Sequence, residues 1–283
     1  MKKLILNFWI KKTQSTTKYN FMQLINEINA IISIAFRDGI KYVKNPTRLL
    51  FSAVFPIIFI GALGGSLDSN LSGTVGFNFI SFVLTGVFAQ TWFSTVASGV
   101  ISLKQDYEKN LTQELFVAPI SRVSIILGKI FGEMGTAFLQ GVFIILFGLL
   151  LGVSFTFTQI LLMTFAGVIV GIMGGAFGIF VMSFLGDTKF INSVFPLLLL
   201  PQYFLAGSFS PIQELPWYLW WLSRAIPLTY GVDFVRNLFY TGLPELELVT
   251  LFSTGFAFAV LGIYTLALVI LGSTRFASQQ KNR

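Results

Sequence analysis

The amino-acid sequence contains no cysteine and no histidine among its 283 residues. Without cysteine the chain forms no disulfide and has no thiolate nucleophile, and without histidine it lacks the commonest zinc ligand and general base. Any catalysis would have to rest on carboxylates, lysine, tyrosine or serine. Charge is scarce as well, since Asp, Glu, Lys and Arg make up 11% of the chain, against about 25% in a typical soluble domain.

Apolar residues are correspondingly abundant, at 54% of the chain with a mean hydropathy of +0.78. Together with the low charge, this composition predicts an integral membrane protein. The net charge is +7, but the basic residues cluster outside the apolar runs. The excess therefore indicates orientation in a membrane and not a nucleic-acid partner.

Residues 1–20 are expected to form a disordered or loosely membrane-bound basic arm, and residues 21–45 an amphipathic helix. Between Phe21 and Val43 the apolar positions recur at helical spacing, while polar residues take the other faces. Polar residues interrupt this helix too often for it to cross a membrane, so we expect it to lie in the interface plane. A simple amphipathic linker is the alternative.

Long uncharged runs follow at residues 49–67, 77–103, 190–209 and 248–272. Each is long enough to cross a hydrocarbon core of about 30 Å. The stretch from Met134 to Gly186 has no charge and is long enough for two spans, the first of which starts near Ile125 and carries Lys129 and Glu133 one turn apart at its polar end. We therefore predict an all-α integral membrane protein with six transmembrane helices within residues 46–273.

The distribution of basic residues sets the orientation. With the N-terminus inside, only Arg224 and Arg236 of the nineteen Lys and Arg residues lie outside. An even number of spans returns the basic tail, residues 274–283, to the same side, as the positive-inside rule requires. Both termini are therefore predicted to be cytoplasmic.

Glycines on the predicted fourth helix recur every four residues, at Gly167, Gly171 and Gly175, with Gly174 and Gly178 beside them. Small residues at this spacing let a neighbouring backbone approach closely. The ladder indicates tight helix packing without identifying the partner helix.

Residues 104–129 form the longest polar interruption between two apolar runs on the cytoplasmic side. Within it, residues 110–118 can form a short helix with Leu111, Leu115 and Ala118 on one face, and Pro119 ends it. Such a helix could carry force from a soluble partner. An ordinary solvated loop fits the same residues.

A second informative stretch, residues 210–247, lies on the outer side. Between Pro216 and Pro227 the segment WYLWWLSRAI is aromatic and apolar but too short to cross, so it should enter the outer leaflet or lie along it. An aromatic belt without further function is the alternative. Asp233 and Arg236 follow three residues apart on a predicted helix, where they can pair.

No motif for catalysis or ATP binding is present. Gly128-Lys129 resembles the end of a phosphate-binding loop, but Val123 stands where that motif needs glycine and Ile130 where it needs Ser or Thr. Ionisable residues lie only at the ends of the predicted spans, which argues against transport driven by an ion gradient. We expect no catalytic residues, metal or cofactor in this chain.

Three stretches resemble the permease subunits of ABC-2 type exporters, a family that includes drug, polysaccharide and teichoic-acid export permeases. The first is KNPTRLLFSAVFPIIFIGALGG at residues 44–65, and the second is YEKNLTQELFVAPISRVSIILGKI at residues 107–130. The third and most specific is FLAGSFSPIQELPWYLWWLSRAIPLTYGVDFVRN at residues 204–237. Together they span most of the chain from residue 44 onward.

The resemblance implies a coupling helix and an external re-entrant hairpin. In the family, a short cytoplasmic helix between the second and third spans docks in a groove of a separate ATPase. It matches about residues 110–120 here, with Asn110, Glu114, Leu115, Phe116, Val117, Pro119 and Arg122 as the coupling residues. The hairpin before the last span matches about residues 210–240, with Pro211, Leu215, Pro216, Trp217, Pro227, Tyr230, Asp233 and Arg236.

The resemblance also implies the function and the partners. Two permease copies assemble with two copies of the ATPase, which binds ATP and Mg, and the complex exports a hydrophobic or amphipathic substrate such as a drug, a lipid or a lipid-linked glycan. The chain itself would be a transport subunit and not an enzyme, in contact with membrane lipid. We expect a bacterial inner membrane, with a plastid membrane as the alternative. Two other functions fit the residues: an ATPase-independent channel or scaffold, and a membrane enzyme acting on lipid-linked substrates.

Overall fold

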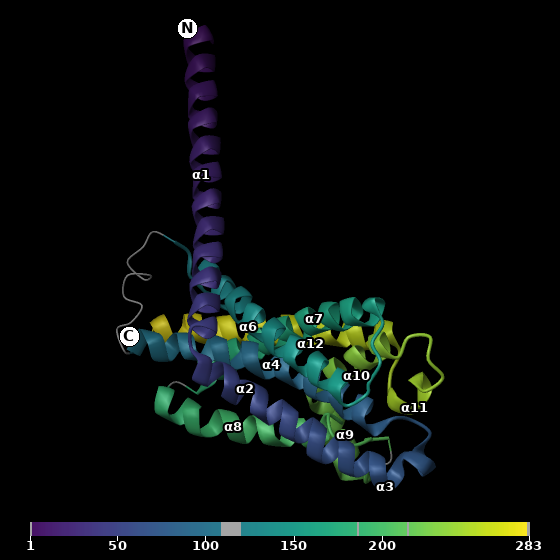
Figure 1. The fold of residues 1–283 in the computed structure, drawn as a ribbon. Helices are drawn as coiled ribbons and strands as arrows, with labels where there is room; N and C mark the ends of the chain where they lie inside the picture. Colours follow the sequence, from purple (N-terminus) through teal and green to yellow (C-terminus); the bar gives the residue numbers. More distant parts are fainter. Residues whose placement is uncertain (1, 109–119, 186, 214, 282–283) are drawn as a thin grey trace.

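The computed structural model describes residues 2–108, 120–185, 187–213 and 215–281. All regular elements in these ranges are helices (Figure 1), which confirms the predicted all-α class. Five of the described helical runs are long and apolar enough to cross a membrane: Leu49–Asn70, Phe79–Asp106, Arg122–Leu150, Phe157–Phe184 and Leu246–Arg275. They match five of the six predicted spans in position.

The first of these runs has a π-helical section in its middle. α2 (Pro46–Ile58) begins with a proline, whose fixed φ and missing N–H suit the first turn of a helix. The π-helix η1 (Phe59–Gly64) follows shortly after Pro56, and α3 (Gly65–Val75) continues the run. Because Pro56 donates no hydrogen bond to the helix ladder, irregular turns are expected beside it.

α4 (Phe79–Glu108) is the central helix of the bundle. It contacts η1, α6 (Arg122–Leu150), α7 (Phe157–Phe184) and α10 (Pro227–Phe239). All residues from 81 to 93 are buried, including Phe82 and Trp92. A helix that is buried all round belongs to the protein core and not to the lipid boundary.

α12 (Thr254–Lys281) packs on α7 and α10 at the periphery of the bundle. It exposes large apolar side chains, among them Ile263, Leu266 and Ile270. Such an exposed apolar face is expected where a helix borders lipid.

α1 (Lys2–Val43) crosses the bundle instead of running along it, and its N-terminal part extends far beyond the other helices (Figure 1). Residues 2–20, predicted as a separate arm, continue the helix predicted over residues 21–45. Only the C-terminal part of α1 packs on α6. The location of α1 in a membrane interface stays a prediction.

α8 (Thr188–Leu205) occupies the position of the predicted fifth span but is not among the five runs named above. It is followed by α9 (Trp217–Ala225), α10 and the short α11 (Leu246–Val249). Figure 1 shows these last three elements at one end of the bundle, whereas the crossing part of α1, the start of α6 and the last turns of α12 lie at the other end. The two ends therefore carry different segments of the sequence, and their orientation in a membrane stays a prediction.

Candidate functional site

The predicted coupling segment follows α4 and precedes α6 in the chain, and α1 crosses the bundle at the start of α6. Six of its seven predicted residues are outside the part of the chain that the structure describes: Asn110, Glu114, Leu115, Phe116, Val117 and Pro119. The seventh, Arg122, is exposed and begins α6. The chain enters α6 through the residues directly after this segment, Ile120, Ser121 and Arg122.

Ser121 is fixed to α1 by the Glu27 carboxylate. The backbone N–H of Ser121 donates to the two carboxylate oxygens at 2.9 and 3.0 Å, and its hydroxyl donates to Oε2 at 2.9 Å. The Ser121 hydroxyl oxygen also caps α6 by accepting from the Ser124 N–H at 3.1 Å. Hydrogen bonds from Ser124 and Ser121 lower the pKa of Glu27, so this carboxylate is ionised at neutral pH.

A small apolar cluster lies next to this contact. Ile34 of α1, Leu103 of α4 and Ile125 of α6 are buried together, and Ile120 packs against them. Burial of each such side chain contributes about 1.5–3 kcal/mol. The cluster therefore joins the three helices where the chain leaves α4 and enters α6.

α1 crosses α6 over two glycines. A Cβ atom added at Gly128 would lie 2.9 Å from the Ile34 Cβ and 3.1 Å from the Ile31 carbonyl oxygen. A Cβ added at Gly132 would lie 3.1 Å from the Asp38 Cβ. Because the two glycines are four residues apart, they share one face of α6 and let the α1 backbone approach closely.

A buried ionic cluster lies at the same crossing. The Lys129 ammonium donates to the Asp38 carboxylate at 2.8 Å and lies 3.3 Å from Oε1 of Glu133. The three side chains expose 7% or less of their surface, and Arg37 adds a second cation 3.1 Å from Asp38. Buried charges are stable only when paired, so Lys129 locks α1 onto α6.

The pKa of Asp38 reflects a competition between burial and charge. Burial is the largest influence and raises it, but the charges of Lys129 and Arg37 and their hydrogen bonds together outweigh burial and lower the pKa below its ordinary value. Asp38 is therefore ionised at neutral pH.

α4 closes the cluster from a third side. The Glu133 side chain lies over Gly99 of α4, where an added Cβ would fall 2.0 Å from Glu133 Cγ. Further along the helices, the Thr95 hydroxyl donates to Gln140 at 2.6 Å, and the Gln140 amide donates to the Tyr42 hydroxyl at 3.2 Å. Polar contacts thus link α1, α4 and α6 over several turns.

At the opposite end of the bundle, Arg236 fastens α10 to the core. Its guanidinium donates to the Gly207 carbonyl at 2.6 Å and the Phe82 carbonyl at 3.2 Å, and it lies 3.5 Å from the centre of the Phe82 ring. Gly207, at φ 77°, has a left-handed conformation that glycine adopts most readily. Burial lowers the pKa of Arg236 to about 10, which leaves it cationic at neutral pH.

Asp233 and Arg236, which the sequence places where they can pair, form no direct ion pair in the part of the chain that the structure describes, although the charge of Arg236 lowers the pKa of Asp233. The Asp233 carboxylate instead accepts the backbone N–H groups of Leu251 at 2.6 Å and Phe252 at 3.1 Å, in the turn before α12. Those N–H groups have no partner in a helix ladder, so the carboxylate satisfies them. Burial raises the pKa of Asp233 to about 6, against the opposing effect of these hydrogen bonds.

The other predicted hairpin residues lie on or beside α9 and α10. Pro216 precedes α9, Trp217 begins it with 77% of its surface exposed, and Pro227 begins α10. The Tyr230 hydroxyl donates to the Arg224 carbonyl at 2.9 Å. Two short helices thus occupy the segment predicted as a hairpin, together with the half-buried residues Pro211 and Leu215.

The predicted glycine ladder of α7 lies against neighbouring side chains. A Cβ at Gly167 would fall 2.5 Å from the Trp92 ring, whereas Cβ atoms at Gly171 and Gly175 would meet side chains no closer than 3.3 and 3.0 Å. The nearest side chains come from α4 and α6.

The closest backbone approach involves the glycines beside the ladder. A Cβ at Gly174 would fall 2.3 Å from the Phe93 carbonyl oxygen, and one at Gly178 would fall 2.6 Å from the Ala97 carbonyl oxygen. A backbone atom cannot rotate away as a side chain can. Gly174 and Gly178 therefore set the distance between α7 and α4.

Sequence analysis missed Glu27, Asp38, Gly128 and Gly132, which build the joint between α1 and α6. The two glycines have the four-residue spacing of the α7 ladder, but sequence analysis considers Gly128 only as part of a phosphate-binding motif. Glu27 and Asp38 have no sequence signal of their own, because their partners lie about ninety positions away.

Comparison with known proteins agrees with this arrangement. A model of the ABC-2 type transporter family matches residues 29–240. A Cyanophora paradoxa protein, named as the transport permease ycf38, is 27% identical over 234 residues, which cover 81% of this chain and 78% of the relative. A Pyropia yezoensis protein of the same name is 25% identical over 241 residues, covering 81% and 79%. Since the family model covers most of the chain, the protein belongs to the ABC-2 type transporter family.

Proposed function

We propose that this chain is the permease subunit of an ATP-driven exporter, and that residues 110–120 receive the movement of a separate ATPase. Two copies of the chain would assemble with two ATPase subunits, which would bind ATP and Mg. The cargo would be a hydrophobic or amphipathic molecule, such as a drug, a lipid or a lipid-linked glycan.

The observation that carries the proposal is the joint beside residues 109–119. Glu27 holds Ser121, and Lys129 holds Asp38, so the start of α6 and the crossing part of α1 are fastened together. An ATPase shifts a permease between two states only by its differential affinity for them. A stiff joint passes that difference to α4 and α6, whereas a loose loop would absorb it.

For the membrane topology, we propose that α8 is the fifth of six spans. Its 18 residues give a length of about 27 Å, close to the hydrocarbon thickness of about 30 Å. Lys189, Asn192 and two prolines reduce its apolar character. With six spans both termini are cytoplasmic, and α9 and α10 form an external hairpin that enters the outer leaflet.

The relatives bear on the type of membrane. The two similar proteins come from Cyanophora paradoxa and Pyropia yezoensis, and for this chain we propose a bacterial inner membrane, with a plastid membrane as the alternative. Fractionation of the source cells would distinguish the two membranes.

Co-purification tests the proposed partnership. The chain should be isolated in lipid together with candidate soluble ABC ATPases from its source cells, and the Glu114→Ala/Phe116→Ala double variant should be compared with Glu247→Ala, which removes an exposed carboxylate at the opposite end. We expect the double variant to fold but to lose ATPase binding and export, while Glu247→Ala keeps both. Unchanged export by the double variant would refute the role of residues 110–120.

The two alternatives make different predictions in the same experiment. A channel or scaffold would conduct or bind without any ATPase. A membrane enzyme would modify a lipid-linked substrate in the purified single subunit. Either result, if no ATPase is found in the preparation, would reject the proposal that the chain is a subunit of an ATP-driven exporter.

A further inference from the structure

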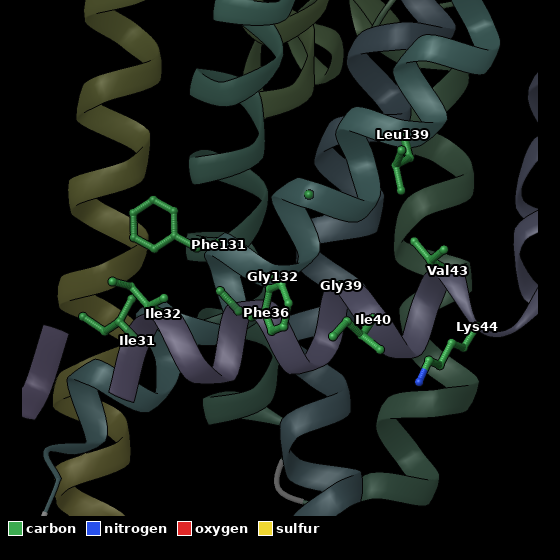
Figure 2. Close-up of a pocket in the computed structure, with 12 residues that line it drawn as sticks. Ile31, Ile32, Phe36, Gly39, Ile40, Val43, Lys44, Phe131, Gly132 and Leu139 are labelled. Carbon is green, nitrogen blue, oxygen red and sulfur yellow. The ribbon is translucent and has the colours of Figure 1, made fainter. Parts of the chain in front are cut away.

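An open apolar groove lies in the corner between α1 and α6 (Figure 2). Its volume is about 810 Å³. One wall is the face of α1 that carries Ile32, Phe36 and Val43, which expose 57% or more of their surface. The other wall is the outer face of α6, and the lining residues from that helix are Phe131, Gly132, Gly135 and Leu139.

Two glycines keep the groove open. A Cβ atom added at Gly39 or at Gly135 would meet no atom within 4 Å. Neither glycine is therefore needed for close packing of α1 on α6, unlike Gly128 and Gly132. A larger side chain at Gly39 or Gly135 would instead project into the groove.

The polarity of the groove is distributed unevenly. Its lining is apolar except for Lys44, which directly follows the end of α1 (Figure 2). Lys41, one turn earlier, is also exposed. An occupant that matches this surface has a long apolar part and a negative group at one end.

We propose that the groove binds an anionic phospholipid of the cytoplasmic leaflet. One acyl chain lies along α6 over Gly135, and the phosphate pairs with Lys44. An acyl chain needs no hydrogen-bond partner, and the groove walls offer none. A cationic rim near the membrane surface attracts an acidic headgroup.

The proposal uses the membrane orientation proposed above, but it does not depend on the ATPase. The bound lipid would fill the corner beside the Lys129–Asp38 cluster and exclude water from it. It would thereby support the joint between α1 and α6.

The test measures lipid binding to the purified full chain in detergent, with phosphatidylglycerol and phosphatidylcholine of identical acyl chains as probes, by native mass spectrometry. Gly135→Leu and Gly39→Leu fill the groove, and Lys44→Gln removes the rim cation. Gly262→Leu is the matched control, because Gly262 is an exposed glycine on α12 with no atom within 4 Å of an added Cβ. The oligomeric state of each sample is measured in parallel by light scattering.

We expect the wild type and Gly262→Leu to retain phosphatidylglycerol in preference to phosphatidylcholine. Lys44→Gln should weaken phosphatidylglycerol binding by about fivefold, the contribution of one basic residue near a membrane surface. Both groove-filling variants should lose the bound lipid of either kind. Equal retention by Gly135→Leu, Gly39→Leu and the wild type would overturn the proposal.

Two other outcomes would also overturn it. Equal binding of both lipids by the wild type would show that the groove does not recognise the acidic headgroup. Loss of dimers in the groove-filling variants, with lipid retained, would assign the groove to a second copy of the chain. Because no outcome uses ATP hydrolysis, failure of the ATPase partnership would be distinguishable from failure of the lipid site.

Discussion

The Glu27 carboxylate on α1 holds both the backbone N–H and the hydroxyl of Ser121, which lies 94 positions further along the chain and caps α6. α1 is thus attached to the chain directly after residues 109–119. A force applied to that segment would reach α1 and α6 together. This relationship connects the geometry of the described residues with the proposed coupling to an ATPase.

Replacing Glu27 by Ala should uncouple transport from ATP hydrolysis without unfolding the protein. Glu27 is on the surface, so its loss leaves no buried group unpaired, but Ser121 loses its attachment to α1. We expect export per ATP hydrolysed to fall several-fold in proteoliposomes, while the thermal midpoint stays close to that of the wild type. Asn26→Ala, an exposed neighbour, is the control. An unchanged transport ratio in Glu27→Ala would show that Ser121 needs no such anchor.

Replacing Lys129 by Met should destabilise the protein strongly. The change keeps the length of the side chain but leaves the buried Asp38 carboxylate without its main cation, which costs about 3–5 kcal/mol for a buried pair. Thermal unfolding in detergent would measure this loss, with the exposed Lys41→Met as the control.

A triple variant tests the reason for that loss. Asp38→Asn/Lys129→Met/Glu133→Gln removes the carboxylate charges together with the ammonium, so no unpaired buried charge remains. It should be clearly more stable than Lys129→Met alone. If the two variants are equally unstable, the loss comes from packing and not from charge.

The pH dependence of stability should show that Lys129 and Arg37 lower the pKa of Asp38 by more than burial raises it. Its pKa in the folded protein is below the ordinary value of 3.8, so its contribution is fully present above that value and is lost as the pH falls through the folded pKa. The stability difference between the wild type and Asp38→Asn should be constant from pH 8 to pH 5 and should shrink only below about pH 4. A difference that already shrinks between pH 7 and pH 5 would mean that burial raises this pKa.

Gly174→Ala should damage the packing of α7 on α4. The new methyl group would fall 2.3 Å from the Phe93 carbonyl oxygen, which cannot move without shifting the α4 backbone. We expect a loss of about 1–3 kcal/mol, as is typical of overpacked cores. Gly262→Ala, which meets no atom within 4 Å, should be neutral or slightly stabilising. Similar midpoints for the two variants would contradict this packing.

The spans could be predicted from the sequence because their signal is local. Uncharged runs of sufficient length locate five candidate membrane helices and the position of α8 without any tertiary information. Helical periodicity likewise locates the part of α1 that packs on the bundle. In the predicted hairpin segment, Pro216 directly precedes α9 and Pro227 begins α10. Proline is favoured at the start of a helix, so these two positions indicate the helix starts from the sequence.

The joint could not be predicted, because its contacts connect residues that are far apart in the sequence. Lys129 has a carboxylate one turn away in Glu133, so sequence analysis gives it a local partner, while its shorter contact is with Asp38 of α1. Asp233 and Arg236 show the same limit. They lie three positions apart on one helix and interact through their charges, but their direct hydrogen bonds go to backbone groups of other segments.

The most direct test of the account is the accessibility of residues 109–119 to a membrane-impermeant thiol reagent. Since the chain has no cysteine, Gln113→Cys introduces a single site, and Ser154→Cys places one in the turn between α6 and α7 as the control for the opposite side. The account predicts that Gln113→Cys is labelled only from the cytoplasmic face and is protected when the ATPase is added, while Ser154→Cys is labelled only from outside. Labelling of Gln113→Cys from the external face would contradict it.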